Sequence, residues 1–575
     1  MANDQAIFQR IASELELPVK DVAAAAALLD DGNTVPFVAR YRKEVTGNMD
    51  DQKLRELERS LDRIRQLEQR REDIMRLICE QDKLDSKLEQ AIFSAASMAE
   101  LEDLYRPFRP KRRTRAMIAR EAGLLPLAQA IKSPKVARQE VMRLAAELAG
   151  SEAFPDVEAT LVGAGDILAE ALADSAAVRE RLRRALLREA RLVSRQKQEG
   201  DSVYRLYYEF AEPWPRIKGY QVLAINRGEK EGWLKVEMNS TQIDPQAILE
   251  HFFTVQAEKQ DIVAQICLDA WKRLLKPSLE TELRAELTAR AHEEAMQIFS
   301  ANLRATLLAP PLRDKVVLAM DPGYRNGCKL AVSGKQGEVL DTDHIYPLPP
   351  QARERDSSAT LLRLIKRYGV EVIAVGNGTA TRETEQFAQK VLAEADLTLP
   401  MLIVNEAGAS VYSASPLAAA EFPDLDVSVR SAISLARRLQ DPLAELVKIE
   451  PEALGVGQYQ HDMNQKELTA RLDTVVEDCV NEVGCDLNTA SQALLRHIAG
   501  INDTVAKNIV AYRQEHGGFN KRDELKKVPR LGPKAFEQCA GFLRIHNGDE
   551  PLDNTSVHPE SYAAARKLLK RFGLG

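Results

Sequence analysis

The sequence predicts a multidomain, predominantly α-helical protein that contains one α/β domain. At 575 residues the chain is too long for a single hydrophobic core. Aromatic residues make up only 5% of the chain, while the strong helix formers Ala, Leu, Glu and Arg are abundant. Short apolar runs alternate with helical segments only between residues 314 and 450.

The composition is typical of a protein that works in water. Hydrophobic residues make up 45% and charged residues 29% of the chain, and no apolar run approaches the length of a membrane span. The N-terminus lacks the basic start and apolar stretch of a secretory signal. We therefore expect a cytoplasmic protein without membrane contact. The six cysteines form no C-x-x-C pair, so no disulfide framework, structural zinc site or other cofactor is predicted.

Residues 1–200 are predicted to form an N-terminal helical region. Apolar residues recur there at steps of three and four, which indicates one long helix; they are Leu54, Leu57, Leu61, Ile64 and Leu67. Two irregular segments are expected, at 34–47 and 103–116. Residues 201–310 are predicted to contain a small β segment and central helices, because 201–245 mixes β-branched and aromatic residues around a glycine turn, typical of one small hairpin.

A strongly basic segment lies within the second irregular stretch. Residues 106–120 carry seven Lys or Arg and no acid, although the formal net charge of the chain is −7. Pro107 and Pro110 exclude a continuous helix, which predicts an exposed basic loop. The loop residues expected to contact phosphates are Arg109, Lys111, Arg112, Arg113 and Arg115. A second basic stretch, 179–197, is interpreted as a solvated helix face.

Residues 314–450 are predicted to form an α/β domain of the RNase H-like class. Three strands in hairpin order are expected at 316–321, 328–333 and 337–348. Helix and strand then alternate through 357–368, 370–376, 382–395, 401–406 and 428–447.

Folds of this class place carboxylates from separate elements around divalent metals that hydrolyse phosphodiesters. Candidates here are Asp321, Glu406 and Asp441. Each has a structural alternative: Asp321 opens an Asp-Pro-Gly turn, Asp441 precedes a proline as an N-cap does, and Glu406 orients the following loop. No catalytic residue or metal ligand is assigned, and a metal-dependent, structure-selective nuclease remains an alternative function.

Residues 464–548 are predicted to form a tandem helix-hairpin-helix domain. Two turns, at 498–502 and 528–532, share an apolar-x-x-apolar pattern and each precede a helix. Glycine lets such a turn approach a phosphate, and the helix dipole favours the anion. Asn502 replaces a glycine in the first copy, where asparagine tolerates left-handed angles, and Arg530 replaces one in the second.

The residues expected to contact nucleic acid in this domain are Gly500, Asn502, Lys507, Arg513, Arg530, Gly532 and Lys534. Contacts of this kind recognise the sugar–phosphate backbone, so binding should be largely independent of base sequence. Alternatively, either copy is only a packing scaffold for the other.

Long motifs along almost the whole chain resemble the Tex family of bacterial transcription accessory proteins. They include TVPFVARYRKEVTG, EDLYRPFRPKRRTRAMIAREAGLLPLA, LAINRGE, AMDPGYRNGCKLAV, GNGTATRETEQF, VNEAGASVYSASPLA and GVGQYQHDM. The resemblance implies a helix-turn-helix-containing N-terminal part, a YqgF-like RNase H-type domain generally regarded as lacking nuclease function, and a helix-hairpin-helix domain. It also implies kinship with a eukaryotic transcription elongation factor.

Members of that family usually continue into a C-terminal OB-fold RNA-binding domain. No β-rich segment follows the hairpins in this sequence, and residues 549–575 are expected to form a C-terminal helix that begins a region missing here. RNA binding by that module is therefore not transferred to this chain.

These observations predict a non-catalytic, nucleic-acid-binding accessory to transcription. Its partners would be RNA, DNA or both, with RNA polymerase or ribosome-associated transcripts as further candidates. Besides the nuclease, a protein-interaction platform whose hairpins only pack remains an alternative.

Overall fold

The computed structural model describes residues 2–110, 112–254 and 256–573, and the chain divides into two compact units. Unit 1 combines Met1–Glu58 with Met296–Gly575, and unit 2 contains Arg59–Ala295. Helices dominate both units, which confirms the predominantly α-helical class. Among the described helices, none combines the length and apolar character that a membrane crossing requires.

The predicted long helix near the N-terminus is α4 (Asp51–Cys79). All five residues of the predicted apolar stripe are buried, with at most 6% of their surface exposed. This helix therefore confirms the periodicity argument. The preceding helices of unit 1 are α1 (Ala2–Leu15), α2 (Val19–Asp30) and α3 (Val35–Tyr41).

The prediction of an irregular segment at 34–47 is wrong for its first half, which is helix α3. Thr34 lies before the helix with extended angles, and Pro36 stands in the first turn, where its missing N–H costs nothing. Val35, Pro36 and Phe37 are buried. The proline therefore starts a helix here and does not interrupt one.

Unit 2 is a set of helices with one small sheet. Besides most of α4 and part of α15 (Lys276–Leu307), its longer helices are α5 (Ser86–Ser94), α6 (Met98–Tyr105), α7 (Arg115–Glu121), α8 (Leu125–Lys132), α9 (Arg138–Leu148), α10 (Val157–Asp174), α11 (Ala176–Glu189), α12 (Gly219–Lys230) and α14 (Gln260–Asp269). The sheet is antiparallel with the order β2-β1-β3, formed by β1 (Arg191–Gln196), β2 (Glu209–Pro213) and β3 (Leu234–Asn239).

The predicted single hairpin at 201–245 is therefore wrong in two respects. One of the three strands, β1, lies before residue 201, in the region that was expected to be helical. The apolar residues from Val222 to Ile225 belong to helix α12, whose N-terminus is capped by Gln221, and all four are buried. A helix and a strand separated by Gly232, with φ +83°, produce the same local composition as a hairpin.

The α/β domain of unit 1 contains a five-stranded mixed sheet with the order β6-β5-β4-β7-β8. Its strands are β4 (Val317–Asp321), β5 (Cys328–Ser333), β6 (Val339–Ile345), β7 (Val372–Gly376) and β8 (Met401–Val404). β4, β5 and β6 pair antiparallel in hairpin order, whereas β7 and β8 join in parallel. This arrangement confirms the predicted RNase H-like element order.

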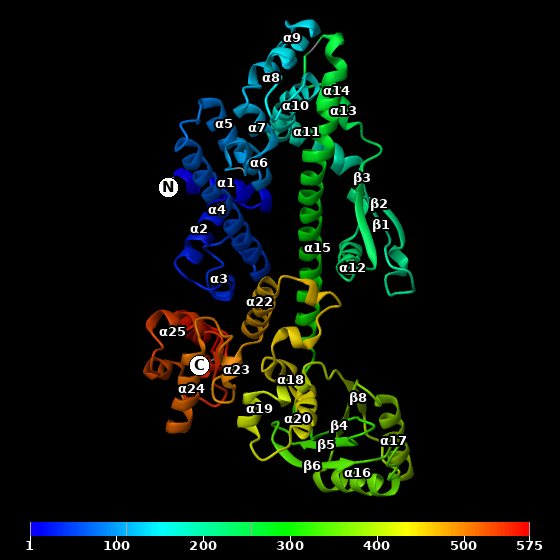
Figure 1. The fold of residues 1–575 in the computed structure, drawn as a ribbon. Helices are drawn as coiled ribbons and strands as arrows, with labels where there is room; N and C mark the ends of the chain where they lie inside the picture. Colours follow the sequence, from blue (N-terminus) through cyan, green and yellow to red (C-terminus); the bar gives the residue numbers. More distant parts are fainter. Residues whose placement is uncertain (1, 111, 255, 574–575) are drawn as a thin grey trace. The chain divides into compact units, whose positions relative to one another are not determined.

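Helices cover both faces of this sheet (Figure 1). On one face, α16 (Glu354–Tyr368) and α17 (Thr381–Glu394) contribute Leu361 and Phe387 to the larger core. On the other face, α20 (Val427–Gln440) packs against β4, β5 and β7. The sheet is thus buried between helical layers, and its strand ends are the positions left for a site.

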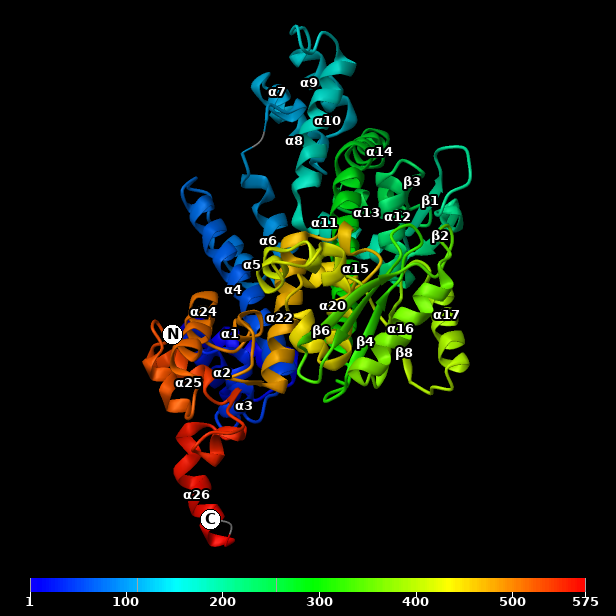
Figure 2. The same cartoon turned by 90° about the horizontal axis from the view of Figure 1, so that it is seen from below.

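The C-terminal part of unit 1 contains the predicted helical hairpins. Its helices are α22 (Gln465–Val483), α23 (Gln492–Leu495), α24 (Asp503–His516), α25 (Pro533–Cys539) and α26 (Tyr562–Arg571). β9 (Cys485–Asp486) pairs in parallel with β10 (Leu543–Arg544), which joins the start of the first hairpin to the end of the second. Figure 2 shows α26 extending away from α24 and α25.

The basic stretch 179–197 divides into buried and exposed arginines. Arg179, 1% exposed, bonds to Asp103 of α6 and Glu282 of α15, and Arg183 contacts the same two carboxylates. Arg184, by contrast, is exposed and pairs only with a glutamate of its own helix. Part of this basic segment is therefore a structural ion network, and only the remainder is a solvated face.

We predict that Arg179→Met destabilises unit 2 by about 3 kcal/mol, because the buried Asp103 and the half-buried Glu282 each lose one of their two arginine partners. Thermal unfolding of the full chain measures this effect. The matched control, Arg184→Met on the same helix, should change stability by about 0.5 kcal/mol or less. Equal effects of the two variants would contradict a structural role for the buried network.

Candidate nucleic-acid interface

The turn of the first hairpin is held from the inside by Asn481 of α22. This side chain, 1% exposed, donates to the carbonyl of His497 at 2.8 Å and accepts from the backbone N–H of Ala499 at 2.9 Å. Gly500 follows with φ +76°, and a Cβ added there would lie 2.6 Å from Cβ of Gln538 on α25. Both the backbone angle and the close approach of α25 favour glycine at this position.

Asn502 has a different role from the one predicted. Its φ is −93°, outside the left-handed region, and its side-chain oxygen accepts a hydrogen bond from the backbone N–H of Val505 at 3.0 Å. The residue is therefore the N-cap of α24, and the expectation that it replaces a left-handed glycine is wrong. One N–H at the start of α24 is satisfied by the protein itself.

The first turn has a basic side, formed by α24, and an acidic side, formed by a hollow next to α22. Lys507 is exposed on α24 and has no side-chain partner among the described residues. Burial lowers the pKa of His497 to about 4, so this imidazole is uncharged at neutral pH. A hollow of about 610 Å³ beside the turn is lined by the acidic Asp473 and Glu477. The favourable approach for a polyanion is therefore the Lys507 side of α24.

The second turn adds another exposed cation next to Lys507. Arg530 has φ +66° and is exposed, and the described part of the chain offers its guanidinium no partner. The Asn508 side chain donates to the carbonyl of Pro529 at 2.8 Å. Asn508 and Pro529 are the chain neighbours of Lys507 and Arg530, so this hydrogen bond joins the two hairpin segments that carry the exposed cations. Gly532 then starts α25 as its N-cap, exposed and with φ −76°.

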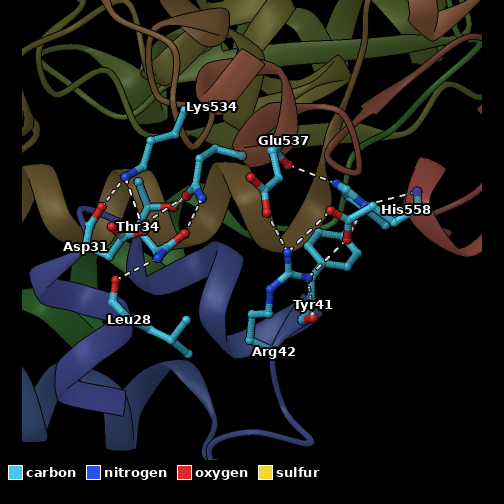
Figure 3. Close-up of polar contacts among 11 residues, drawn as sticks. Leu28, Asp31, Thr34, Tyr41, Arg42, Lys534, Glu537 and His558 are labelled. Atoms are coloured by element: carbon cyan, nitrogen blue, oxygen red, sulfur yellow. Dashed lines mark hydrogen bonds and ion pairs between the residues drawn. The ribbon is translucent and has the colours of Figure 1, made fainter. Parts of the chain in front are cut away.

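Lys534 is bound by the N-terminal part of the chain (Figure 3). Its ammonium donates to the carbonyl of Asp31 and pairs with the Asp31 carboxylate at 3.3 Å. The side chain of Gln538, one turn later, accepts from the backbone N–H of Thr34 at 2.9 Å and donates to Asn33 at 2.7 Å. The role of Asp31 has no signal in any local motif, because it lies 503 residues from Lys534.

The contact of the N-terminal helices with α25 extends to residue 42. Arg42 donates to Glu537 at 2.5 Å, and a Cβ added to Gly541 would lie 2.2 Å from the hydroxyl of Tyr41. The ring of His558 lies 4.9 Å from that of Tyr41 (Figure 3). One side of α25 is thus covered by the protein and is not free for another ligand.

Arg513 also points into the domain. Its guanidinium donates to the carbonyls of Leu487 at 3.2 Å and Ala490 at 2.7 Å, and burial lowers its pKa. These bonds tie α24 to the segment before α23. A phosphate contact by Arg513 stays a prediction.

The basic loop of unit 2 lies between Tyr105, at the end of α6, and Thr114, the N-cap of α7. Arg109 pairs with Glu102, and Arg113 pairs with Glu121 at 2.8 Å. Of the other loop cations, Arg112 and Arg115 are exposed, and Lys111 lies outside the residues that the structure describes. The described residues between Arg109 and Thr114 are non-helical and lead into α7, as predicted. The expected bounds 103–116 are wrong at both ends, because α6 and a 3₁₀ helix (Arg106–Phe108) precede the loop and α7 starts at Arg115.

The structure brings two of the three candidate carboxylates of the α/β domain together. Asp321 ends β4 and accepts a hydrogen bond from Ser431 of α20, while burial raises its pKa. Glu406 follows β8 and accepts a hydrogen bond from the backbone of Gly378. Burial and the nearby Asp321 both raise the pKa of Glu406.

Asp441 does not join this pair. It caps α21 (Pro442–Leu446) by accepting from the backbone N–H of Ala444 at 3.1 Å, as the N-cap alternative predicts. The adjacent Gln440 bonds to the carbonyl of Lys315, before the start of β4, whereas Asp321 is at the other end of this strand, roughly 13 Å away. Within the described residues, no group of three or more His, Cys, Asp or Glu is placed to hold a metal ion.

Models of known protein families match most of the chain. In chain order the matches are a Tex-like protein N-terminal domain (5–79), a Tex central region-like domain (137–299), a Tex protein YqgF-like domain (315–440), a helix-hairpin-helix motif (480–544) and an HHH domain (550–575).

Curated relatives are similar over nearly the whole chain. The protein named Protein tex of Bordetella pertussis is 47% identical over 98% of this chain and 74% of its own length. Transcriptional accessory protein Tex of Neisseria gonorrhoeae is 46% identical over 99% of this chain and 76% of its own length. A human protein, S1 RNA-binding domain-containing protein 1, is 35% identical over 95% of this chain and 61% of its own length.

We predict that Arg530→Gly stabilises the hairpin domain by about 0.5–1 kcal/mol, because a side chain at φ +66° strains the backbone and glycine does not. Denaturant unfolding of the full chain measures this change. The control Lys527→Gly, at the exposed end of the 3₁₀ helix Arg522–Lys527, should destabilise the domain, since its φ is not positive. A loss of stability in both variants would show that Arg530 makes a stabilising contact.

Proposed function

Because the chain belongs to the Tex family of transcriptional accessory proteins, we propose that it binds nucleic acid in the cytoplasm as a non-catalytic scaffold during transcription. The observation that carries this proposal is the pairing of Lys507 and Arg530. Both cations are exposed, they lie on hairpin segments joined by the Asn508–Pro529 hydrogen bond, and neither has a protein partner in the described chain. Their position beside two helix starts suits a polyanion.

The contacts available to this surface are with phosphates. Lys507 and Arg530 lie beside helix starts, where phosphates are favoured, so we expect binding that is largely independent of base sequence. Both RNA and DNA offer a phosphate backbone, and the human relative is named for an RNA-binding domain. The exposed Arg112 and Arg115 of unit 2 supply a second set of contacts. RNA polymerase and ribosome-associated transcripts are the partners that this role suggests.

We predict that the double variant Lys507→Glu/Arg530→Glu weakens binding at least ten-fold for single- and double-stranded RNA and DNA alike. Loss of two phosphate contacts should also reduce the slope of log affinity against log salt by about two. Fluorescence anisotropy at several salt concentrations measures both quantities.

The control for this variant is Lys466→Glu/Lys335→Glu, which makes the same change in net charge at exposed positions outside the hairpin turns. It should leave affinity within two-fold of the wild type. If the turn variant instead binds like this control, the hairpins are a packing or protein-docking module.

A metal-dependent nuclease is the second candidate function, and the proximity of Asp321 to Glu406 is the observation that favours it. Against it, the third predicted ligand is a helix cap at the other end of β4.

We predict that the purified chain does not cleave branched or single-stranded substrates in Mg²⁺ or Mn²⁺, as followed on denaturing gels. Cleavage that disappears in Asp321→Asn would replace the scaffold proposal with a catalytic one.

A further inference from the structure

A cavity of about 490 Å³ lies beside the basic loop of unit 2. This volume falls within the range of about 300–1,000 Å³ that is typical of sites for small organic groups. Its apolar lining comes from Pro107, Met117 of α7 and Ala171 of α10. The cavity is therefore a place where the loop, α7 and the end of α10 leave room for a flat, partly apolar group.

The charged side chains that line this cavity all have ion-pair partners, two of which lie outside the lining. Arg109 pairs with Glu102, and Arg120 lies 3.7 Å from the carboxylate of Glu170. Asp174, which also lines the cavity, lies 3.7 Å from Arg106. A phosphate entering here would meet two carboxylates and would have to displace them. An uncharged group with donors and acceptors on its edge would meet matching partners without that penalty.

A nucleobase has these properties. Its edge carries both donors and acceptors, and its faces stack on guanidinium planes and apolar side chains. The Arg109 guanidinium is held in place by Glu102 and by the ring of Tyr105, 5.7 Å below it. A base in the cavity would find this plane already oriented.

The exposed arginines next to the cavity suit the phosphates on either side of such a base. Arg112 follows the cavity residue Arg109 by three positions, and Arg115 starts the helix that carries Met117. Both are exposed. The cavity, whose charges are paired, thus suits the base of a nucleotide, and the exposed arginines outside it suit the phosphates.

We infer that this cavity receives one unstacked base of a single-stranded nucleic acid, while Arg112 and Arg115 contact the flanking phosphates. The inference rests on the proposed function. It restricts the nucleic acid bound at the basic loop to single strands. A base within a duplex is stacked and paired, and it enters a cavity only after both interactions are broken. The basic loop therefore selects single strands, whereas the hairpins contact either form.

Ala171→Trp tests the inference, because Ala171 is exposed and a tryptophan there fills the cavity without disturbing a buried core. The full-length variant should bind a single-stranded oligonucleotide at least five-fold more weakly than the wild type and a duplex equally well. Its salt slope should stay unchanged, since no phosphate contact is removed. The control is Ala146→Trp, at an exposed position of α9 that does not line the cavity.

A second measurement uses a single strand that carries 2-aminopurine. Unstacking of this base in the cavity should raise its fluorescence with the wild type and with Ala146→Trp, but not with Ala171→Trp. The smaller substitution Ala171→Met should give an intermediate single-strand affinity and an intermediate fluorescence. It replaces Ala171→Trp as the test variant if tryptophan impairs folding.

Equal affinities of Ala171→Trp and the wild type for single strands would overturn the inference, as would equal losses for single strands and duplexes. If the wild type binds neither form at low salt, the proposed function fails together with the inference. If the wild type binds and the Lys507/Arg530 variant does not, but filling the cavity has no effect, only the inference fails.

Discussion

The hydrogen bonds of the buried Gln538 side chain hold the N-terminal helices against α25. They thereby determine which hairpin residues stay exposed. Gln538 is 2% exposed, and its amide is satisfied by Thr34 and Asn33 from the other end of the chain. A buried amide that loses its partners costs about 1–3 kcal/mol for each unsatisfied group, so the N-terminal helices stay in place. Their position directs Lys534 toward Asp31 and leaves Lys507 and Arg530 exposed on the two hairpins.

The same separation of buried from exposed cations recurs in unit 2. Arg179 and Arg183 bond to carboxylates of two other helices, and their charge is used within the fold. Arg112 and Arg115 stand in solvent. A net charge of −7 is compatible with polyanion binding for this reason, because what a phosphate encounters is the local set of unpaired cations.

Local patterns predicted the elements whose formation is decided by neighbouring residues. The stripe from Leu54 to Leu67 indicated α4, and the order of hairpin strands followed by alternating elements indicated the mixed sheet. Such local patterns could not predict which groups Asp441 and Lys534 contact. A proline after Asp441 is compatible with both a cap and a ligand, and only the fold shows which end of β4 it faces. Lys534 meets an aspartate 503 positions away, which no motif records.

The chain order of unit 1 has a consequence for synthesis on the ribosome. The α1–α3 segment leaves the exit tunnel first, whereas Gln538, to which Thr34 binds, follows 504 positions later. At 5–20 residues per second this interval is on the order of 25–100 s. During that time Phe37 of α3 also lacks His558, whose ring lies 5.9 Å from its own in the folded chain. The contact between the two ends of the chain therefore forms only after nearly all of unit 1 has been synthesised.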